Sequence, residues 1–332
     1  MGKFDSKKLS EIIKYLKHSN DVIIPPTPGC DAGVYKVDNN RYMVISSDPC
    51  TNVPREWFGW LMIHYPSSDV ATFGTKPTMA AINLLGPTGT NYKVYERIMH
   101  QASKAARELK IDIIAGHTGN YSSLSEVIGI CTVAGFVNKE RLVKPTNSKP
   151  GDLILIVKPL GLETLTNFSL VNYKKSRILF GSKKAQSLRA MVHCQTCVDE
   201  ALLLAKYERL HAMHDITEGG LITALNEMAD LSNLGFEIFY ENLPMMEEMR
   251  NLQEYFRLSM IETLSASSTG CLIASISPDN KDEIIEVLNK KGFTNKITGK
   301  FSQKKGRFIN LKNRKVKFPQ KAKDPYIKII YS

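Results

Sequence analysis

The stretch DITEGGLITALNEMAD, residues 215–230, places an aspartate, a threonine and two adjacent glycines directly before an apolar run. The apolar side chains recur at helical spacing and predict a helix with one buried face: Leu221, Ala224, Leu225, Met228 and Ala229. The residues before this run are typical of a helix start, with Asp or Thr as the N-cap. They also suit a ligand site, because the backbone N–H groups at a glycine-rich helix start are free for anions.

Four positions in the N-terminal half share this design, in which an aspartate or histidine stands at a strand end or in a glycine-containing turn. They are Asp31 in PGCDAGV, Asp48 in SSDPC, Asp69 in SSDVATFG and His117 in AGHTG. Carboxylates that converge need a cation, and magnesium takes oxygen ligands from carboxylates, water and phosphate. Taken singly, each position also fits a turn, a strand end or a helix cap, and no Walker-type or G-x-G-x-x-G motif is present.

The length of 332 residues favours two domains, because one hydrophobic core seldom supports so long a chain. A polar stretch with two prolines, NKERLVKPTNSKPGD, contains the predicted boundary, so we expect domains over residues 1–148 and 149–332. Strands and helices mix in both halves, which predicts an α/β or α+β class.

Periodicity and turn residues predict individual elements. In the N-terminal half we expect helices over residues 57–77 and 91–111, strands over 41–48 and 78–87, and mostly loop over 22–37. Across residues 112–119 and 126–137 we expect a strand, a turn and a strand. In the C-terminal half we expect strands over 153–159, 236–244 and 270–278, and helices over 183–207 and 282–292 besides the one that follows Gly220.

Cys194 and Cys197 form one C-x-x-C, preceded by His193, inside the predicted helix over residues 183–207. Tetrahedral zinc wants a second pair of ligands, so a single C-x-x-C is weak evidence for a metal site. Free cysteine is often buried, and packed thiols on a helix are the favoured interpretation.

The net charge of +11 is concentrated near the C-terminus. Between Gln303 and Lys323 nine basic residues stand without an acid: Lys304, Lys305, Arg307, Lys312, Arg314, Lys315, Lys317, Lys321 and Lys323. We favour a solvated terminal hairpin over a tail that contacts nucleic acid or an acidic partner.

We expect a cytoplasmic protein with no membrane segment. No stretch offers the roughly 18 uncharged apolar residues that a membrane span needs. Residues 1–19 are predicted to form an amphipathic helix and lack the apolar core of a signal peptide. In that compartment the six cysteines would stay reduced.

The order of these motifs resembles the PurM superfamily, ATP-using enzymes named for aminoimidazole ribonucleotide (AIR) synthetase, over nearly the whole chain. The superfamily also contains selenophosphate synthetase, thiamine-monophosphate kinase and the hydrogenase-maturation protein HypE. Its Gly-Asp loop, strand ending in Asp, Asn-Asp-[Leu/Ile]-Ala-x-x-Gly-Ala-x-Pro segment and Gly-[Gly/Asp]-x-Thr turn are matched by GCDAGV, VISSD, SSDVATFGTKP and AGHT. The second-domain motif Asp-x-Thr-x-Gly-Gly-Leu is matched by DITEGGL, and residues 215–230 look most like HypE.

The resemblance implies a homodimer whose N-terminal domains pair their sheets and form ATP clefts, with the C-terminal domain closing over the cleft. It implies that Asp31, Asp48, Asp69 and Asp215 hold magnesium and the nucleotide phosphates. Catalytic roles are expected for Asp69 and His117, and Gly116, His117 and Thr118 are expected to form a second turn beside the phosphates. Further nucleotide contacts are expected at the other small polar residues and glycines of the motifs: Ser47, Ser68, Thr217, Gly219 and Gly220.

The chain departs from the family pattern in four places. Ser68 stands where Asn is usual, and His117 replaces the acidic residue of the kinase and purine enzymes, although selenophosphate synthetases carry His there. HypE-type proteins end in Pro-Arg-Ile-Cys, whereas this chain ends DPYIKIIYS with no cysteine after Cys271, so the HypE reaction is not expected. Cys30 lies in the phosphate loop and is a poor equivalent of the reactive Cys or Sec of selenophosphate synthetase.

We therefore predict an ATP- and magnesium-dependent enzyme in which an amide or carbonyl oxygen, or a similar nucleophile, attacks the γ-phosphate. Catalysis would come mainly from positioning and electrostatic stabilisation. A nucleotide-binding, non-catalytic regulatory or scaffold relative is the alternative, suggested by His117 and the missing terminal cysteine. Nucleic-acid binding through residues 304–323 is less favoured. The acceptor, a small molecule or a protein, cannot be deduced from the sequence.

Overall fold

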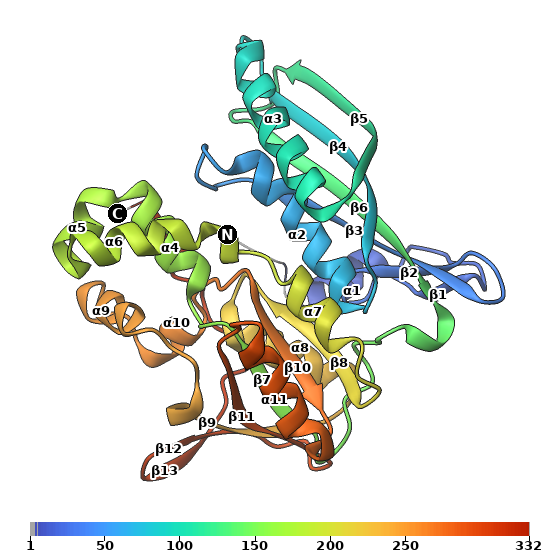
Figure 1. Cartoon of the computed structure of the whole chain (residues 1–332), viewed down its shortest axis with the longest axis vertical. Coiled ribbons are helices and arrows are strands. Elements are labelled where there is room, and N and C mark those ends of the chain that lie inside the picture. The colour runs from blue at the N-terminus through green and yellow to red at the C-terminus, as the bar shows by residue number, and fades with distance from the viewer. Residues whose placement is uncertain (1–3, 5, 332) are drawn as a thin grey trace. The chain divides into compact units, whose positions relative to one another are not determined.

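The computed structural model describes Phe4 and residues 6–331, which divide into two compact units. The N-terminal unit holds Lys17–Pro26 and Asp31–Leu142. The C-terminal unit holds the chain from Val143 onward, Thr27–Cys30 and the described residues up to Leu16. Each unit combines helices with one sheet (Figure 1), so the expected α/β two-part architecture is confirmed. The domain boundary after residue 148 stays a prediction.

The N-terminal unit is built on a six-stranded sheet with the order β1-β2-β3-β6-β4-β5. Its strands are β1 (Val22–Ile24), β2 (Gly33–Lys36), β3 (Arg41–Cys50), β4 (Pro77–Pro87), β5 (Asp112–Tyr121) and β6 (Ile128–Asn138). Neighbouring strands are antiparallel except β4 and β5, which run parallel and are joined by helix α3 (Tyr92–Leu109). A parallel pair needs such a crossover because its strands begin at the same end.

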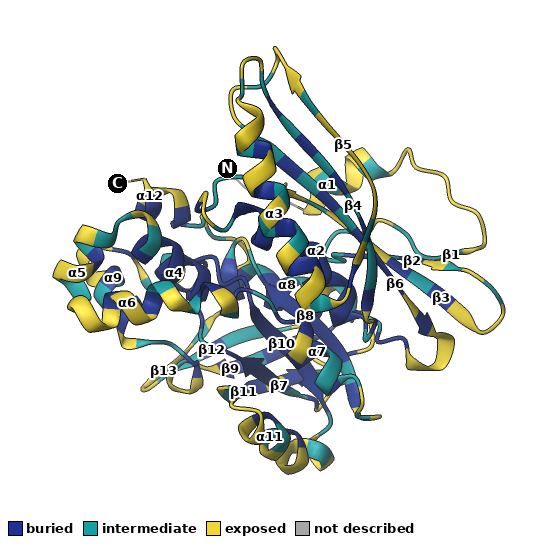
Figure 2. Ribbon diagram, turned by 45° about the horizontal axis from the view of Figure 1, so that its top comes forward, coloured by how far each residue is buried: buried dark blue, intermediate teal, exposed yellow. Residues whose placement is uncertain are grey.

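Helix α2 (Phe58–Thr72) is buried around nearly its whole circumference, and only Tyr65 among its residues is not buried. It packs against the sheet and against α3, whose outer side stays exposed (Figure 2). The two helices approach so closely that a Cβ on Gly59 would lie 2.0 Å from the Ile98 carbonyl oxygen. Together α2 and α3 cover one face of the sheet and leave the other face open (Figure 1).

Two of three expectations for the local structure of the N-terminal unit are wrong. Residues 22–37 are mostly loop, as expected, with the short strands β1 and β2 in them. Residues 116–118, expected to form a turn, lie inside β5, because strand pairing with β4 continues through Asn83 opposite His117. Asp48 does not end its strand, which runs on to Cys50, whereas Asp69 lies inside α2, within the expected helix.

The C-terminal unit is built on a seven-stranded sheet with the order β13-β12-β9-β11-β7-β10-β8. The strands are β7 (Leu153–Val157), β8 (Leu210–Ile216), β9 (Gly235–Phe239), β10 (Cys271–Ile276), β11 (Asn295–Ser302), β12 (Arg307–Leu311) and β13 (Arg314–Lys317). Helix α8 (Gly220–Leu231), predicted from its apolar spacing, buries Leu221, Leu225 and Met228 in the main core with these strands.

The other helices of this unit are mostly short: α1 (Ser6–Ile13), α4 (Leu162–Val171), α5 (Tyr173–Phe180), α6 (Ser182–Ala190), α7 (Val198–Leu204), α9 (Glu247–Tyr255), α10 (Met260–Leu264), α11 (Lys281–Lys290) and α12 (Tyr326–Ile330). A second hydrophobic cluster joins α4, α6, α9 and α12. Within the part of the chain that the structure describes, no helix is both long and apolar enough to cross a membrane.

The helix expected over residues 183–207 is wrong, because α6 ends at Ala190 and α7 begins at Val198. Between them the buried Lys158 ammonium donates hydrogen bonds to the carbonyl oxygens of Cys194 and Thr196. In a continuous helix these oxygens would accept hydrogen bonds from backbone N–H groups. Tertiary packing therefore overrides the helical periodicity. Cys197 is buried in the break, and Cys194 packs against the core from a short 3₁₀ turn.

The basic C-terminal segment forms the expected hairpin, with β12 and β13 at the edge of the sheet. Some of its charge is paired within the unit, because Arg307 forms an ion pair with Asp230 and Lys315 lies 2.7 Å from Glu237. Lysines on an edge strand also hinder pairing with another chain.

Candidate functional site

The N-terminal unit brings two of the expected carboxylates to one layer between its sheet and helix α2. The Ser46 hydroxyl of β3 donates a 2.6 Å hydrogen bond to the Asp69 carboxylate of α2, which is 4% exposed. Side chains alternate along a strand, so Asp48, two residues after Ser46, faces the same layer. The structure therefore places Asp48 and Asp69 on the helix-covered face.

Asp48 also affects a thiol on the neighbouring strand. It lies opposite Cys131 of β6 in the antiparallel register. Burial, and secondly the negative charge of Asp48, raise the pKa of the Cys131 thiol to about 12. The Cys131 thiol therefore stays protonated and packs in this layer as an apolar group, not as a nucleophile.

Ser47 and His117 belong to the opposite, open face of the same sheet. The Ser47 hydroxyl lies 2.8 Å from the Thr132 hydroxyl, and His117 Nε2 lies 2.6 Å from the Tyr121 hydroxyl. Within the N-terminal unit these two residues cannot join Asp48 and Asp69 around one ion. Ser68 is buried in α2, where its hydroxyl donates to the His64 carbonyl oxygen.

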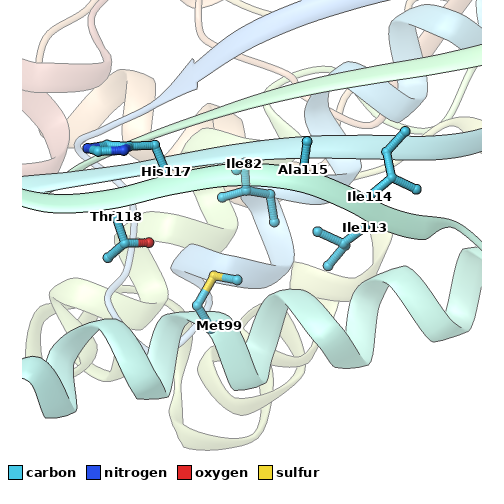
Figure 3. A pocket seen from close by; sticks show the side chains of 8 residues that line it. Ile82, Met99, Ile113, Ile114, Ala115, His117 and Thr118 are labelled. Atoms are coloured by element: carbon cyan, nitrogen blue, oxygen red, sulfur yellow. The ribbon is translucent and has the colours of Figure 1, made fainter.

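Gly116 and Thr118 occupy neighbouring places on β5, next to a notch of about 360 Å³. A Cβ on Gly116 would lie 2.4 Å from the Ile82 carbonyl oxygen, so glycine allows β4 and β5 to pair here. Thr118 points into the notch with Ile82 and Met99, whereas His117 points to the other side of β5 (Figure 3). This mainly aliphatic lining does not suit phosphate groups.

Asp31 follows a tight glycine turn. Gly29 has a φ of +83°, and the Cys30 N–H donates to the Thr27 carbonyl oxygen at 2.9 Å. A Cβ on Gly29 would lie 3.0 Å from Cβ of Glu227 on α8, so the turn packs tightly against that helix. Asp31 itself is half-buried.

Asp215 is the penultimate residue of β8 and is 2% exposed. Its carboxylate Oδ1 lies 3.5 Å from Nδ1 of the neighbouring His214. The other ring nitrogen of His214 lies 3.3 Å from the Glu227 carboxylate of α8. His214 Nδ1 also lies 2.6 Å from the Asp215 backbone carbonyl oxygen, so the ring is held between the end of β8 and helix α8.

The turn between Asp215 and α8, residues 216–220, depends on both of its glycines. Gly219 and Gly220 have φ values of +78° and +56°. A Cβ on Gly220 would lie 2.6 Å from the Leu264 carbonyl oxygen. The Gly220 N–H donates to the Thr217 carbonyl oxygen at 3.0 Å.

The expectation that the glycine N–H groups are free for an anion is wrong. The Gly219 N–H donates a 3.0 Å hydrogen bond to the Asp324 carboxylate, which comes from the chain's C-terminal segment. The same carboxylate oxygen accepts a 2.6 Å hydrogen bond from the Ser267 hydroxyl. Both glycine amides of the turn therefore have partners inside the protein.

Sequence reasoning missed four residues that shape these sites: Ser46, Glu163, Ser267 and Asp324. Ser46 could have been found, since it stands two residues before Asp48 on a predicted strand. Glu163 is almost completely buried beside the Thr269 hydroxyl, and burial raises the pKa of its carboxyl to about 7. Nothing local in the sequence links Glu163, Ser267 and Asp324 to the turn.

Comparison with known proteins gives the family. Residues 29–137 match the N-terminal domain, and residues 149–311 the C-terminal domain, of the family described as AIR synthase related protein. A selenide, water dikinase of Carboxydothermus hydrogenoformans is 24% identical over 337 residues, covering 93% of this chain and 94% of that protein.

Two solved structures show the same fold at low sequence identity. AaThiL complexed with AMPPCP and TMP has a TM-score of 0.74 at 19% identity, covering 94% of this chain and 96% of that one. The hydrogenase maturation protein HypE in complex with ATP has a TM-score of 0.68 at 17% identity, covering 98% and 97%. The chain belongs to the AIR synthase-related family, the PurM superfamily of ATP-dependent enzymes.

Proposed function

We propose that the protein binds ATP with magnesium and uses the γ-phosphate to activate an acceptor. Asp48 and Asp69 are the central ligands of the ion. The observation that carries this proposal is the shared layer of the two carboxylates, held by the Ser46 hydroxyl at 2.6 Å from Asp69. Two carboxylates on one partly buried layer repel each other unless a cation lies between them. Carboxylate oxygens are the protein ligands that magnesium prefers.

Magnesium bound there would neutralise charge on the phosphate oxygens. Asp48 and Asp69 would hold the ion in place, and the Ser46 hydroxyl fixes the Asp69 carboxylate. We further propose that Asp31, Asp215 and Thr217 contribute to the same nucleotide. Such catalysis rests on positioning and electrostatic stabilisation more than on covalent chemistry.

We propose a homodimer formed through the open face of the N-terminal sheet. Large apolar side chains on that face are exposed in the single chain, including Tyr35 at 42%, Ile45 at 36% and Phe136 at 43%. Exposed apolar surface of this kind is typical of an interaction site. His117 lies on the same face, so in the homodimer it would act at or near the second copy of the chain.

The acceptor is proposed to be a separate molecule with an oxygen or similar nucleophile. The relatives are named for different acceptors, so the fold does not choose among them. Helix α12 is packed into its own unit through Tyr326, Ile329 and Ile330. Carboxamides, carbamoyl compounds and phosphate acceptors are the classes to screen.

The substitution Asp69→Asn tests the site. It keeps an oxygen that can accept the Ser46 hydroxyl but removes the charge that would hold magnesium. We expect magnesium-dependent ATP turnover to fall by roughly a hundredfold or more, with the circular dichroism spectrum unchanged. Asp112→Asn, an exposed aspartate at the start of β5, is the matched control and should keep wild-type turnover. Wild-type turnover in Asp69→Asn would overturn the assignment.

A further inference from the structure

The C-terminal segment of the chain contacts the turn that follows Asp215. Asp324 sits between the hairpin β12–β13 and helix α12, and one of its oxygens, Oδ2, accepts both the Gly219 N–H and the Ser267 hydroxyl. Its other oxygen, Oδ1, accepts the Tyr326 N–H at 2.8 Å. A carboxylate with three such donors is held in one orientation.

Ser267 belongs to a hydroxyl-rich loop, residues 265–269, whose side chains are all buried. The loop contacts both the C-terminal segment and the glycine turn. The Ser265 hydroxyl donates to the Lys323 carbonyl oxygen at 2.9 Å, and Gly220 packs under the Leu264 and Ala266 carbonyl oxygens. The loop therefore fixes the position of Asp324 and of the glycine turn together.

The C-terminal segment is anchored on its other side as well. Asn167 of α4 donates a 2.8 Å hydrogen bond to the Tyr326 hydroxyl, and Asn172 donates to the Ile330 carbonyl oxygen at 2.7 Å. Ile329 and Ile330 are buried in the cluster of α4, α6, α9 and α12. Asp324 is thus presented by a well-packed segment and not by a loose tail.

We propose that Asp324 is a positioning residue for the Asp215 turn: its carboxylate clasps the Gly219 amide and the Ser267 hydroxyl and so fixes residues 216–220. The inference rests on the proposed function, in which Asp215 and this turn act on the nucleotide. An amide clasped by a charged acceptor cannot rotate away, so the left-handed conformation of both glycines persists without ligand. The C-terminal segment, 105 residues away in sequence from Gly219, thereby sets the geometry of the turn.

Hydrogen–deuterium exchange of the full-length protein tests the clasp without ATP. In Asp324→Ala, exchange of peptides covering residues 213–222 should rise roughly tenfold or more, because the Gly219 amide loses its acceptor. Asp324→Asn, which retains an acceptor oxygen, should show a smaller rise. Tyr326→Phe is the matched control, since it removes another anchor of the same segment but leaves Asp324 in place, and should leave these peptides unchanged.

Steady-state kinetics with ATP give the second readout. Asp324→Ala should raise the KM for ATP or lower kcat by at least fivefold, Asp324→Asn should recover part of the loss, and Tyr326→Phe should behave as wild type. If Asp324→Ala does not fold, Ser267→Ala, which removes the second donor to the same oxygen, should give the same changes at smaller amplitude.

Each outcome separates the clasp from the proposed function. Unchanged exchange in Asp324→Ala with a native circular dichroism spectrum would show that Asp324 does not hold the turn. Faster exchange with wild-type kinetics would show that the turn has no part in ATP use and would overturn the positioning role of Asp324. Full ATP turnover in Asp69→Asn would overturn the proposed function, while an exchange effect in Asp324→Ala would leave the clasp itself standing.

Discussion

The carboxylate layer of the N-terminal unit and the glycine turn of the C-terminal unit are stabilised in different ways. In the layer, Asp48 and Asp69 are placed by regular elements, a strand whose side chains alternate and an apolar helix packed on it. In the turn, the local conformation depends on two glycines with positive φ and on a carboxylate from the far end of the chain. A site on regular elements can be inferred from periodicity, whereas a site on a turn depends on contacts distant in sequence.

The largest expected effect is on the turn. Gly220→Ala should destabilise the C-terminal unit by roughly 3 kcal/mol or more, because φ is +56° and the new Cβ would meet two carbonyl oxygens of the backbone at 2.6 and 2.8 Å. Gly292→Ala is the matched control, with a similar φ of +78° but open space around the Cβ, and should cost about 1–2 kcal/mol. Chemical denaturation measures both, and equal costs would contradict the importance of the close approach.

A smaller, pH-dependent effect is expected at Glu163, which contacts the same hydroxyl-rich loop through Thr269. Burial raises the pKa of this carboxyl from 4.5 to about 7. Between these values the unfolded chain has lost the proton that the folded chain still binds, so stability falls as the pH rises and the full penalty is present above about pH 7. Glu163→Gln cannot ionise and removes that penalty.

Glu163→Gln should therefore be more stable than wild type by about 1–3 kcal/mol at pH 8 and nearly equal to it at pH 4.5. Thermal or denaturant unfolding across this pH range gives the difference directly. The exposed Glu208→Gln should show no such trend. A difference between Glu163→Gln and wild type that does not change with pH would mean that the Glu163 carboxyl has the same pKa in the folded and unfolded chains.

Much of the fold could be predicted where apolar periodicity is strong. Helices α3 and α8 and strands β4 and β7 lie where the spacing of apolar residues indicated. The predictions failed where glycine and polar residues lie in an exposed strand, as in β5 around His117, and where a distant side chain overrides a helical pattern, as Lys158 does at Cys194. Both failures come from pairing or packing with partners that are remote in sequence.

The arrangement of the candidate site residues could not be predicted from the motifs. The motifs group Ser47 and His117 with Asp48 and Asp69, whereas the structure puts Ser47 and His117 on the other face of the sheet. Alternation along the predicted strand would have separated Ser47 from Asp48. The partner of Gly219 could not be predicted, because no local pattern connects Asp324 with a turn so far away in sequence.

The most direct test of the central claim is isothermal titration of the wild-type protein with ATP, with and without magnesium, paired with a phosphate-release assay. The account predicts binding that requires magnesium, with slow release of phosphate in the absence of an acceptor and faster release once the acceptor is supplied. No binding at millimolar ATP, or binding of equal strength without magnesium, would contradict a nucleotide site built on Asp48 and Asp69.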